Sequence, residues 1–152
     1  MTRLTIRDAH RTEVAAIVRL LHDDENGRLR EDPSEPLDPR YLAAFDAIAE
    51  DPNQQLILAT LDGEPAGTMQ LSYLPGLAFR GAWRCMIESV RIASHLRNQR
   101  LGEELIGWAL DRARQRGCFM VQLTSQKDRT GAHRFYERLG FTQSHAGFKI
   151  RL

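Results

Sequence analysis

The stretch RCMIESVRIASHLRNQRLGEELIGWALDRARQRG, residues 84–117, decides the fold of this chain. Residues 84–93 form a short apolar run rich in β-branched side chains, which favours a buried strand over a helix. A polar and basic segment follows at residues 94–100, and apolar residues then recur at helical spacing up to Gly117. The stretch therefore predicts a strand, a turn and an amphipathic helix in succession.

Glu88 interrupts the predicted strand. Period-two alternation predicts one face made of four side chains, Met86, Glu88, Val90 and Ile92. A carboxylate among apolar neighbours is costly if it is sealed inside the core, so Glu88 needs either a partner or an opening onto a cleft. A structural salt bridge to Arg84 or Arg91 is one interpretation, and a functional carboxylate at a cleft is the other.

The turn before the helix has the character of an anion site. Unpaired N–H groups and the positive end of the helix dipole suit a phosphate, and Arg97 and Arg100 add charge. The turn is not a P-loop, because no Gly-Lys-Ser/Thr follows, and Gly102 alone does not make a dinucleotide fingerprint. The alternative is an ordinary crossover helix with solvated arginines, and Glu103 in its first turn agrees with that.

The segment Arg97-Asn98-Gln99-Arg100-Leu101-Gly102 resembles the Arg/Gln-x-x-Gly-x-Gly/Ala turn of the GNAT superfamily of acetyl-CoA-dependent N-acetyltransferases. Downstream, Ala132-x-x-Phe135-Tyr136-Glu137-x-x-Gly140-Phe141 resembles the second landmark of that family. Arg100 and Arg129 stand where the family usually has glycine and asparagine. The resemblance is strongest over residues 84–141 and weaker over residues 3–21.

The resemblance implies an α/β fold: a mixed, mostly antiparallel sheet with a splayed parallel central strand pair, flanked by about four helices. The sequence pattern predicts strands at residues 2–7, 55–61, 66–74, 84–93 and 118–124, and one or two more in residues 142–152. It predicts helices at residues 12–21, 38–50, 101–116 and 130–139. We expect a single domain spanning residues 1–152.

The resemblance also implies roles for individual residues. Glu88 would be the general base that deprotonates the amine, and Tyr136 would protonate the departing thiolate. The N–H of Val90 would stabilise the oxyanion. The residues expected to contact acetyl-CoA are Val90, Ile92, Arg97, Asn98, Gln99, Arg100, Leu101, Gly102, Glu103, Arg129 and Phe135.

Composition and charge narrow the classes of function that the chain can have. The formal net charge is +1, which creates no broad field for nucleic acid, and no apolar run reaches the roughly 18 residues of a membrane span. The five histidines are scattered without ligand spacing, so we predict no metal site. Cys85 and Cys118 begin strands expected to be neighbours, so a disulfide stays open, but we expect reduced thiols in a cytoplasmic protein.

The resemblance implies an N-acetyltransferase that moves the acetyl group of acetyl-CoA to a primary amine of a small molecule in a ternary complex. The long connection at residues 22–40 is acidic, which hints at a cationic acceptor, although a solvated loop explains it equally well. The alternatives are a protein acetyltransferase acting on a lysine or an N-terminal amine, and a non-catalytic CoA-binding regulatory module. The resemblance also suggests a homodimer.

Overall fold

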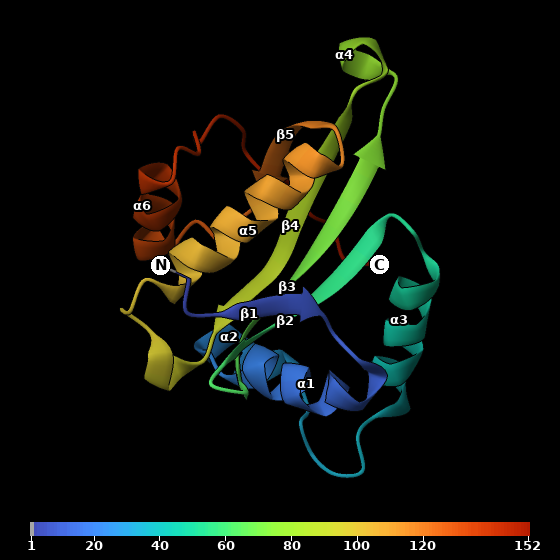
Figure 1. The fold of residues 1–152 in the computed structure, drawn as a ribbon, viewed down its shortest axis with the longest axis vertical. Coiled ribbons are helices and arrows are strands. Elements are labelled where there is room, and N and C mark those ends of the chain that lie inside the picture. The colour runs from blue at the N-terminus through green and yellow to red at the C-terminus, as the bar shows by residue number, and fades with distance from the viewer. Residues whose placement is uncertain (1) are drawn as a thin grey trace. The chain divides into compact units, whose positions relative to one another are not determined.

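A computed structural model describes residues 2–152 of the chain (Figure 1). The strands are β1 (Thr5–Asp8), β2 (Gln54–Leu61), β3 (Glu64–Pro75), β4 (Trp83–Ile92) and β5 (Cys118–Leu123). The helices are α1 (Val14–His22), α2 (Glu25–Arg30), α3 (Pro39–Glu50), α4 (Ala78–Gly81), α5 (Leu101–Gln115) and α6 (Thr130–Arg138). The contacts group the chain into two compact units, one up to Gln122 and one from Leu123, so the single-domain expectation stays a prediction.

The sheet has the strand order β1-β2-β3-β4-β5. The first three pairings are antiparallel, and each joins strands that are consecutive in the sequence. β5 follows the crossover helix α5 and lies parallel to β4, as expected when a helix connects two neighbouring strands. The predicted α/β fold, a mostly antiparallel sheet with one parallel pair, is confirmed.

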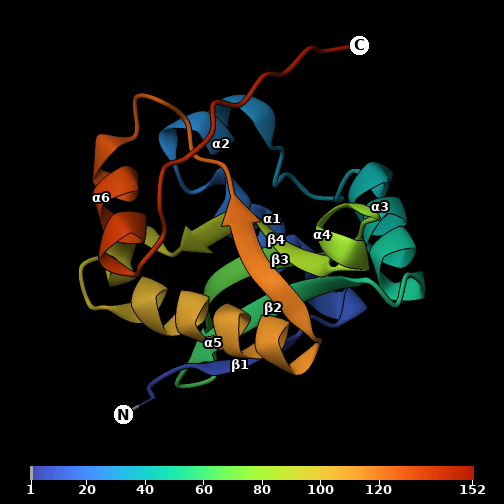
Figure 2. The ribbon, with the colours of Figure 1, turned by 90° about the horizontal axis from the view of Figure 1, so that it is seen from above.

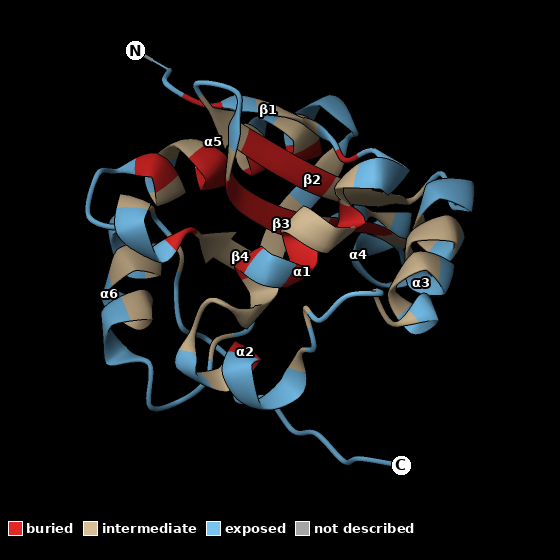
Figure 3. Cartoon of the chain, turned by 90° about the horizontal axis from the view of Figure 1, so that it is seen from below, coloured by how far each residue is buried: buried red, intermediate tan, exposed pale blue. Residues whose placement is uncertain are grey.

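Helices cover both faces of the sheet in the first unit (Figure 2). α5 lies on one face, where Leu105 and Ile106 are buried, and α1 lies on the other, where Ile17 and Leu20 pack against Leu58. Burial is concentrated in β2, β3 and the inner sides of these helices (Figure 3). Leu58 pairs with Thr68 across the sheet, which identifies the α1 face of β3.

The predicted face of β4 is wrong beyond Glu88. The pairing of β3 with β4 shifts register between Thr68 and Gln70, because β4 contains an extra residue there, a β-bulge. Gln70 pairs with Glu88 and Thr68 pairs with Arg91, so both β4 residues lie on the α1 face. Ile92 pairs with Gly67 and is turned to the α5 face.

Two predictions about local structure fail. The connection at residues 22–40 contains a short helix, α2, whose N-cap Asp24 accepts a hydrogen bond from the Gly27 N–H. Residues 142–152 form no strand, although all of them are described and Phe148, Ile150 and Leu152 alternate as a strand would. A strand needs a ladder partner as well as a pattern, and these three side chains are exposed.

Both cysteines are free thiols. Cys85 is buried in β4, and burial raises the pKa of its thiol to about 12. Cys85 is therefore an unreactive core side chain at neutral pH. Among residues 2–152, no helix combines the length and the apolar character needed to cross a bilayer.

Glu13 makes the fold sensitive to acid. The Arg7 guanidinium donates two hydrogen bonds of 2.8 Å to its carboxylate, which lowers the Glu13 pKa from 4.5 to about 2. A depressed folded pKa contributes stability above the unfolded pKa, and this contribution is lost as the pH falls from about 4.5 towards 2. We expect Glu13→Gln to cost about 1 kcal/mol at pH 7. Denaturant unfolding should show the gap to the wild type closing near pH 2, and a pH-independent gap would contradict this assignment.

Candidate active site

Glu88 lies in β4 with its side chain exposed, directly opposite Gln70 of β3. No ion pair to Glu88 forms within the described residues, and Arg91 pairs with Asp24 instead, at 2.9 Å. The Glu88 carboxylate is therefore neither buried in the core nor ion-paired with Arg84 or Arg91, the two partners that the sequence suggested. An open carboxylate on a rigid central strand is available to accept a proton from a bound molecule.

The β-bulge directly follows Glu88. Ser89 has a φ of 55°, a left-handed conformation that a residue other than glycine adopts at a cost. Bulges re-aim side chains and leave backbone groups out of the ladder. Val90, the residue expected to supply the oxyanion N–H, lies within this irregular segment. The sequence placed Val90 in β4 correctly, but alternation could not reveal that its backbone leaves the regular pattern.

The turn after β4 has a left-handed backbone at two positions. Asn98 has a φ of 63° and Arg100 a φ of 64°, and Arg100 is the last residue before α5. Arg100 is a position at which the resemblance leads us to expect glycine, because glycine adopts this conformation without a Cβ clash. The chain therefore adopts a left-handed backbone at Arg100 without the glycine that would favour it.

Arg97 does not point freely into solvent. Its Nη2 donates to the carbonyl oxygen of Asp23 at 2.7 Å, and its Nε donates to that of Ile92 at 3.3 Å. Both contacts fasten the turn to the rest of the first unit. A role for Arg97 in binding phosphate stays a prediction that relies on its remaining N–H donors.

The start of α5 combines a buried anchor with exposed polar groups. The Leu101 side chain is buried, so only its backbone can reach a ligand. The side chain of Gln99 accepts a hydrogen bond from Arg3 at 3.2 Å, while Glu104 accepts the N–H groups of Arg3 and Leu4. The N–H groups of Arg3 and Leu4, just before β1, hold the Glu104 carboxylate, whereas Glu103, the other acid in the first turn of α5, is exposed.

The remaining predicted site residues belong to the second unit. Arg129 is the residue before α6, and Phe135 and Tyr136 lie within that helix. The Tyr136 ring makes edge contacts with Phe135 and Phe141, at centroid distances of 5.2 and 5.7 Å. These contacts hold the ring in place inside the unit. The meeting of Tyr136 with Glu88 stays a prediction.

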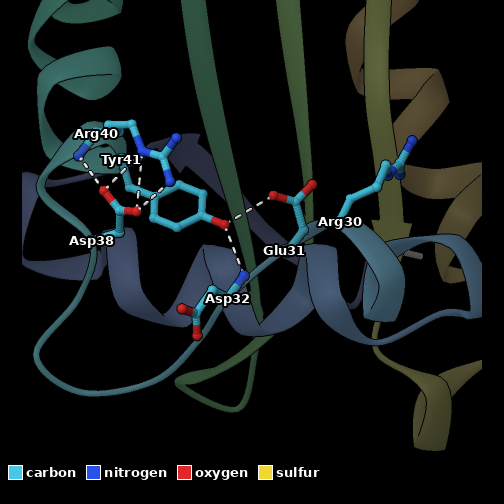
Figure 4. Close-up of a pocket in the computed structure, with 6 residues that line it drawn as sticks. All are labelled: Arg30, Glu31, Asp32, Asp38, Arg40 and Tyr41. Carbon is cyan, nitrogen blue, oxygen red and sulfur yellow. Dashed lines mark hydrogen bonds and ion pairs between the residues drawn. The ribbon is translucent and has the colours of Figure 1, made fainter.

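A hollow of about 390 Å³ lies in the first unit where α2, the following loop and α3 meet (Figure 4). Its lining contains three acids, two arginines and a tyrosine, namely Glu31, Asp32, Asp38, Arg30, Arg40 and Tyr41. The Tyr41 hydroxyl donates to Glu31 at 2.9 Å and accepts the Asp32 N–H at 3.0 Å, and Arg40 pairs with Asp38 at 2.7 Å. Part of the acidity that hinted at a cationic acceptor, the charge of Asp38, is therefore balanced by Arg40 within the connection itself.

Arg100→Gly should stabilise the fold. Glycine removes the left-handed strain at φ 64°, which is worth about 1 to 2 kcal/mol, and loses part of this through its greater unfolded-state entropy. We expect a net gain of about 0.5 to 1 kcal/mol. The control Glu103→Gly, inside α5, should instead lose about 1 kcal/mol. Denaturant unfolding measures both, and a destabilised Arg100→Gly variant would refute the strain.

Sequence reasoning missed the partner of Arg91. The Arg91 guanidinium was a candidate partner for Glu88, but it reaches Asp24 at the start of α2. Asp24 belongs to the acidic connection, yet no local signal distinguishes it from its neighbours. The pairing depends on how α1 and α2 pack against β4, which is a tertiary property.

Comparison with known proteins agrees with this geometry. Residues 14–141 match the Acetyltransferase (GNAT) family. The aminoalkylphosphonate N-acetyltransferase of Salmonella typhimurium is 35% identical over 108 residues, covering 71% of this chain and 70% of that protein. The chain therefore belongs to the GNAT acetyltransferase family, and it is an acyltransferase.

Two solved structures show the same fold. A protein from Bacillus halodurans C-125 described as a transcriptional regulator has a TM-score of 0.95 and 43% identity, covering 98% of this chain and 99% of that one. Glucosamine-6-phosphate N-acetyltransferase from Arabidopsis thaliana has a TM-score of 0.79 at 19% identity, and it covers 99% of each chain. At that identity, the second likeness concerns the fold alone.

Proposed function

We propose that this protein transfers the acetyl group of acetyl-CoA to a primary amine of a small molecule, directly and within a ternary complex. The observation that carries the proposal is the exposed Glu88 carboxylate on the bulged strand β4. This strand leads through the turn at residues 94–100 into the start of α5, where no side chain caps the helix. A relative that acetylates an aminoalkylphosphonate supports a small acceptor. A cationic acceptor is the weaker part of the proposal.

The turn and the start of α5 fit the phosphates of a nucleotide cosubstrate. The first N–H groups of a 15-residue helix have no partner inside the helix, and the dipole of α5 adds partial positive charge. Asn98, Arg100 and Gly102 surround this end, with Arg129 and Phe135 proposed as further contacts from the second unit. The backbone of Val90 and Ile92 would hold the acyl-bearing arm as an added strand.

Transfer then needs three events from the chain's own groups. Glu88 takes a proton from the ammonium, directly or through water, because only a neutral amine has a lone pair and such amines have a pKa near 10.4. The Val90 N–H stabilises the negative charge that develops on the carbonyl oxygen. The nitrogen lone pair then bonds to the acetyl carbon, the carbon–sulfur bond breaks, and Tyr136 gives its proton to the thiolate. The acetylated nitrogen releases its second proton, which restores the phenol.

An acetyl-CoA assay over a panel of amines tests the proposal. The panel should contain aminoalkylphosphonates, polyamines, aminoglycosides, amino acids and lysine-containing peptides, with release of free CoA and mass of the product as readouts. Acetyl-CoA at a hundredfold excess over its dissociation constant should also stabilise the fold by about 2.7 kcal/mol. Transfer only to peptides would favour a protein acetyltransferase.

A non-catalytic CoA-binding regulator is the second candidate. The printed description of the Bacillus halodurans protein is the observation that favours it. The net charge of +1 argues against DNA binding, since contacts to a phosphate backbone require concentrated positive charge. Binding of acetyl-CoA without turnover on any acceptor would support this candidate. A cytoplasmic location remains part of the proposal.

We further propose a homodimer that covers the C-terminal tail. Phe148, Ile150 and Leu152 are all at least 85% exposed, and a second copy of the chain would remove this apolar surface from water. Phe148→Ser with Ile150→Ser should convert a dimer into a monomer, as measured by light scattering. Lys149→Ser with Arg151→Ser is the control and should keep the dimer mass. A strictly monomeric wild type would end this proposal.

A further inference from the structure

Two consecutive aspartates link the junction of α1 and α2 to the end of β4. Asp24 contacts Arg91 through Oδ2 at 2.9 Å, while its Oδ1 accepts the Gly27 N–H and caps α2. Asp23 accepts the N–H of Ser94 at 2.7 Å, at the start of the turn that leads to α5. One dipeptide therefore holds both the β4 bulge and the predicted cosubstrate turn.

The pair of Arg91 and Asp24 is well shielded from solvent. Their side chains are 10% and 15% exposed, against 37% and 22% for the pair of Arg7 and Glu13. A shielded ion pair adds little net stability, but removing one partner leaves an uncompensated charge. Such a pair therefore constrains geometry more than it stabilises the fold.

Arg91 also fixes the backbone of the bulge. Its Nη1 donates to the carbonyl oxygen of Val90 at 2.9 Å, while its Nε faces Asp24. The neighbouring Ser89 has a left-handed backbone, and a strained residue persists only where its surroundings determine its conformation. The planar guanidinium meets these two groups at once, Val90 through a hydrogen bond and Asp24 through an ion pair in which the Nε–H makes no hydrogen bond within residues 2–152, and a lysine ammonium does not reproduce this two-point contact.

We propose that Arg91, held by Asp24, is a positioning residue for acetyl transfer: it holds the bulge in the shape that directs the Glu88 carboxylate and the Val90 N–H. This inference rests on the proposed function. Glu88 and Arg91 lie on the same face of the sheet, on either side of the bulge. Loss of the constraint would loosen both reacting groups without removing either, and small misplacements of reacting groups are costly to rate.

Asp24→Asn tests the proposal with a matched control. Asparagine can still cap α2 through its oxygen, so the substitution removes mainly the charge facing Arg91. Glu13→Gln does the same to another arginine pair that also supports a helix start. We expect kcat to fall at least tenfold in Asp24→Asn, with the KM for acetyl-CoA within about threefold, and to stay unchanged in Glu13→Gln. An unchanged kcat in Asp24→Asn would overturn the proposal.

Two further variants separate positioning from simple charge compensation. Arg91→Lys keeps the positive charge but not the planar guanidinium, so kcat should be at least tenfold lower than in the wild type. Asp24→Asn combined with Arg91→Gln leaves no unpaired charge, so thermal stability should recover relative to Asp24→Asn alone. Turnover should not recover with it. If the double variant regains both stability and kcat, the pair is only structural and the proposal fails.

Amide hydrogen exchange tests whether Asp24 and Arg91 hold the β4 bulge, and it needs no activity assay. In free protein, Asp24→Asn should raise exchange across residues 88–91 at least tenfold over the wild type, while Glu13→Gln should leave it unchanged. Equal exchange in Asp24→Asn and wild type would overturn the positioning role. A wild type with no acetyl transfer to any acceptor would instead remove the proposed function, and the exchange result would still stand.

Discussion

Replacing Glu88 with glutamine is expected to lower turnover near neutral pH by roughly 10²- to 10⁴-fold while acetyl-CoA binding is retained. Glutamine keeps the shape of the side chain but cannot accept a proton from an ammonium. Because Glu88 is exposed and forms no ion pair within the described residues, its loss should change the melting temperature little. Steady-state kinetics on an identified acceptor measures the effect.

Glu64→Gln is a suitable control for Glu88→Gln. Glu64 is an exposed carboxylate at the start of β3, paired with Leu61 at the hairpin rather than with the bulge. Its replacement should leave turnover unchanged. If Glu88→Gln is also fully active, Glu88 is not the base, and the proton must leave the amine by another route. If only the melting temperature falls, Glu88 has a structural role.

Replacing Tyr136 with phenylalanine is expected to lower turnover by about 10²-fold if its hydroxyl protonates the thiolate. Phenylalanine keeps the edge contacts with Phe135 and Phe141, so packing in α6 should survive. The stability cost should be about 1 kcal/mol for one lost hydrogen bond. The affinity for acetyl-CoA should change little, because the interaction is made in the transition state.

Varying the leaving thiol of the acyl donor is a sharper test of the role of Tyr136 as a proton donor. A more acidic thiol leaves without full protonation, so the defect of Tyr136→Phe should shrink with such an acyl donor. Tyr73→Phe is the control. The Tyr73 hydroxyl donates a hydrogen bond to the Gln55 side chain, and its ring is buried on the α5 face beside Arg116. This variant should lose stability without losing turnover. An equal defect of Tyr136→Phe with every leaving group would remove Tyr136 from the proton-donor role.

Local pattern was sufficient for most of the fold. The apolar run of β4, the helical spacing of α5 and the turn residues between β2 and β3 each act over a few neighbours, so they could be interpreted without a structure. The two GNAT motifs were recognisable for the same reason. The identity of most elements, the parallel pair and the family therefore followed from sequence, with most boundaries shifted by a residue or two.

The bulge at Ser89 could not be predicted, because it depends on how β4 pairs with β3 and not on β4 itself. One extra residue turned Ile92 away from the Glu88 face and brought Arg91 onto it. The missing tail strands show the same limit, since Phe148 and Ile150 have the alternation but no partner to pair with. A period of two describes a strand only while its register is unbroken.

The sequence by itself determined the α/β fold and the acyltransferase family, and it predicted that a mechanism depends on Glu88 and the turn before α5. Only the tertiary structure decided that Glu88 is open while Arg91 is held by Asp24, and that Arg100 takes a left-handed backbone. The physical reason is the separation along the chain over which each interaction acts. Propensity and periodicity act between neighbours in sequence, whereas ion-pair partners and strand register are chosen by groups that meet only when the chain has folded.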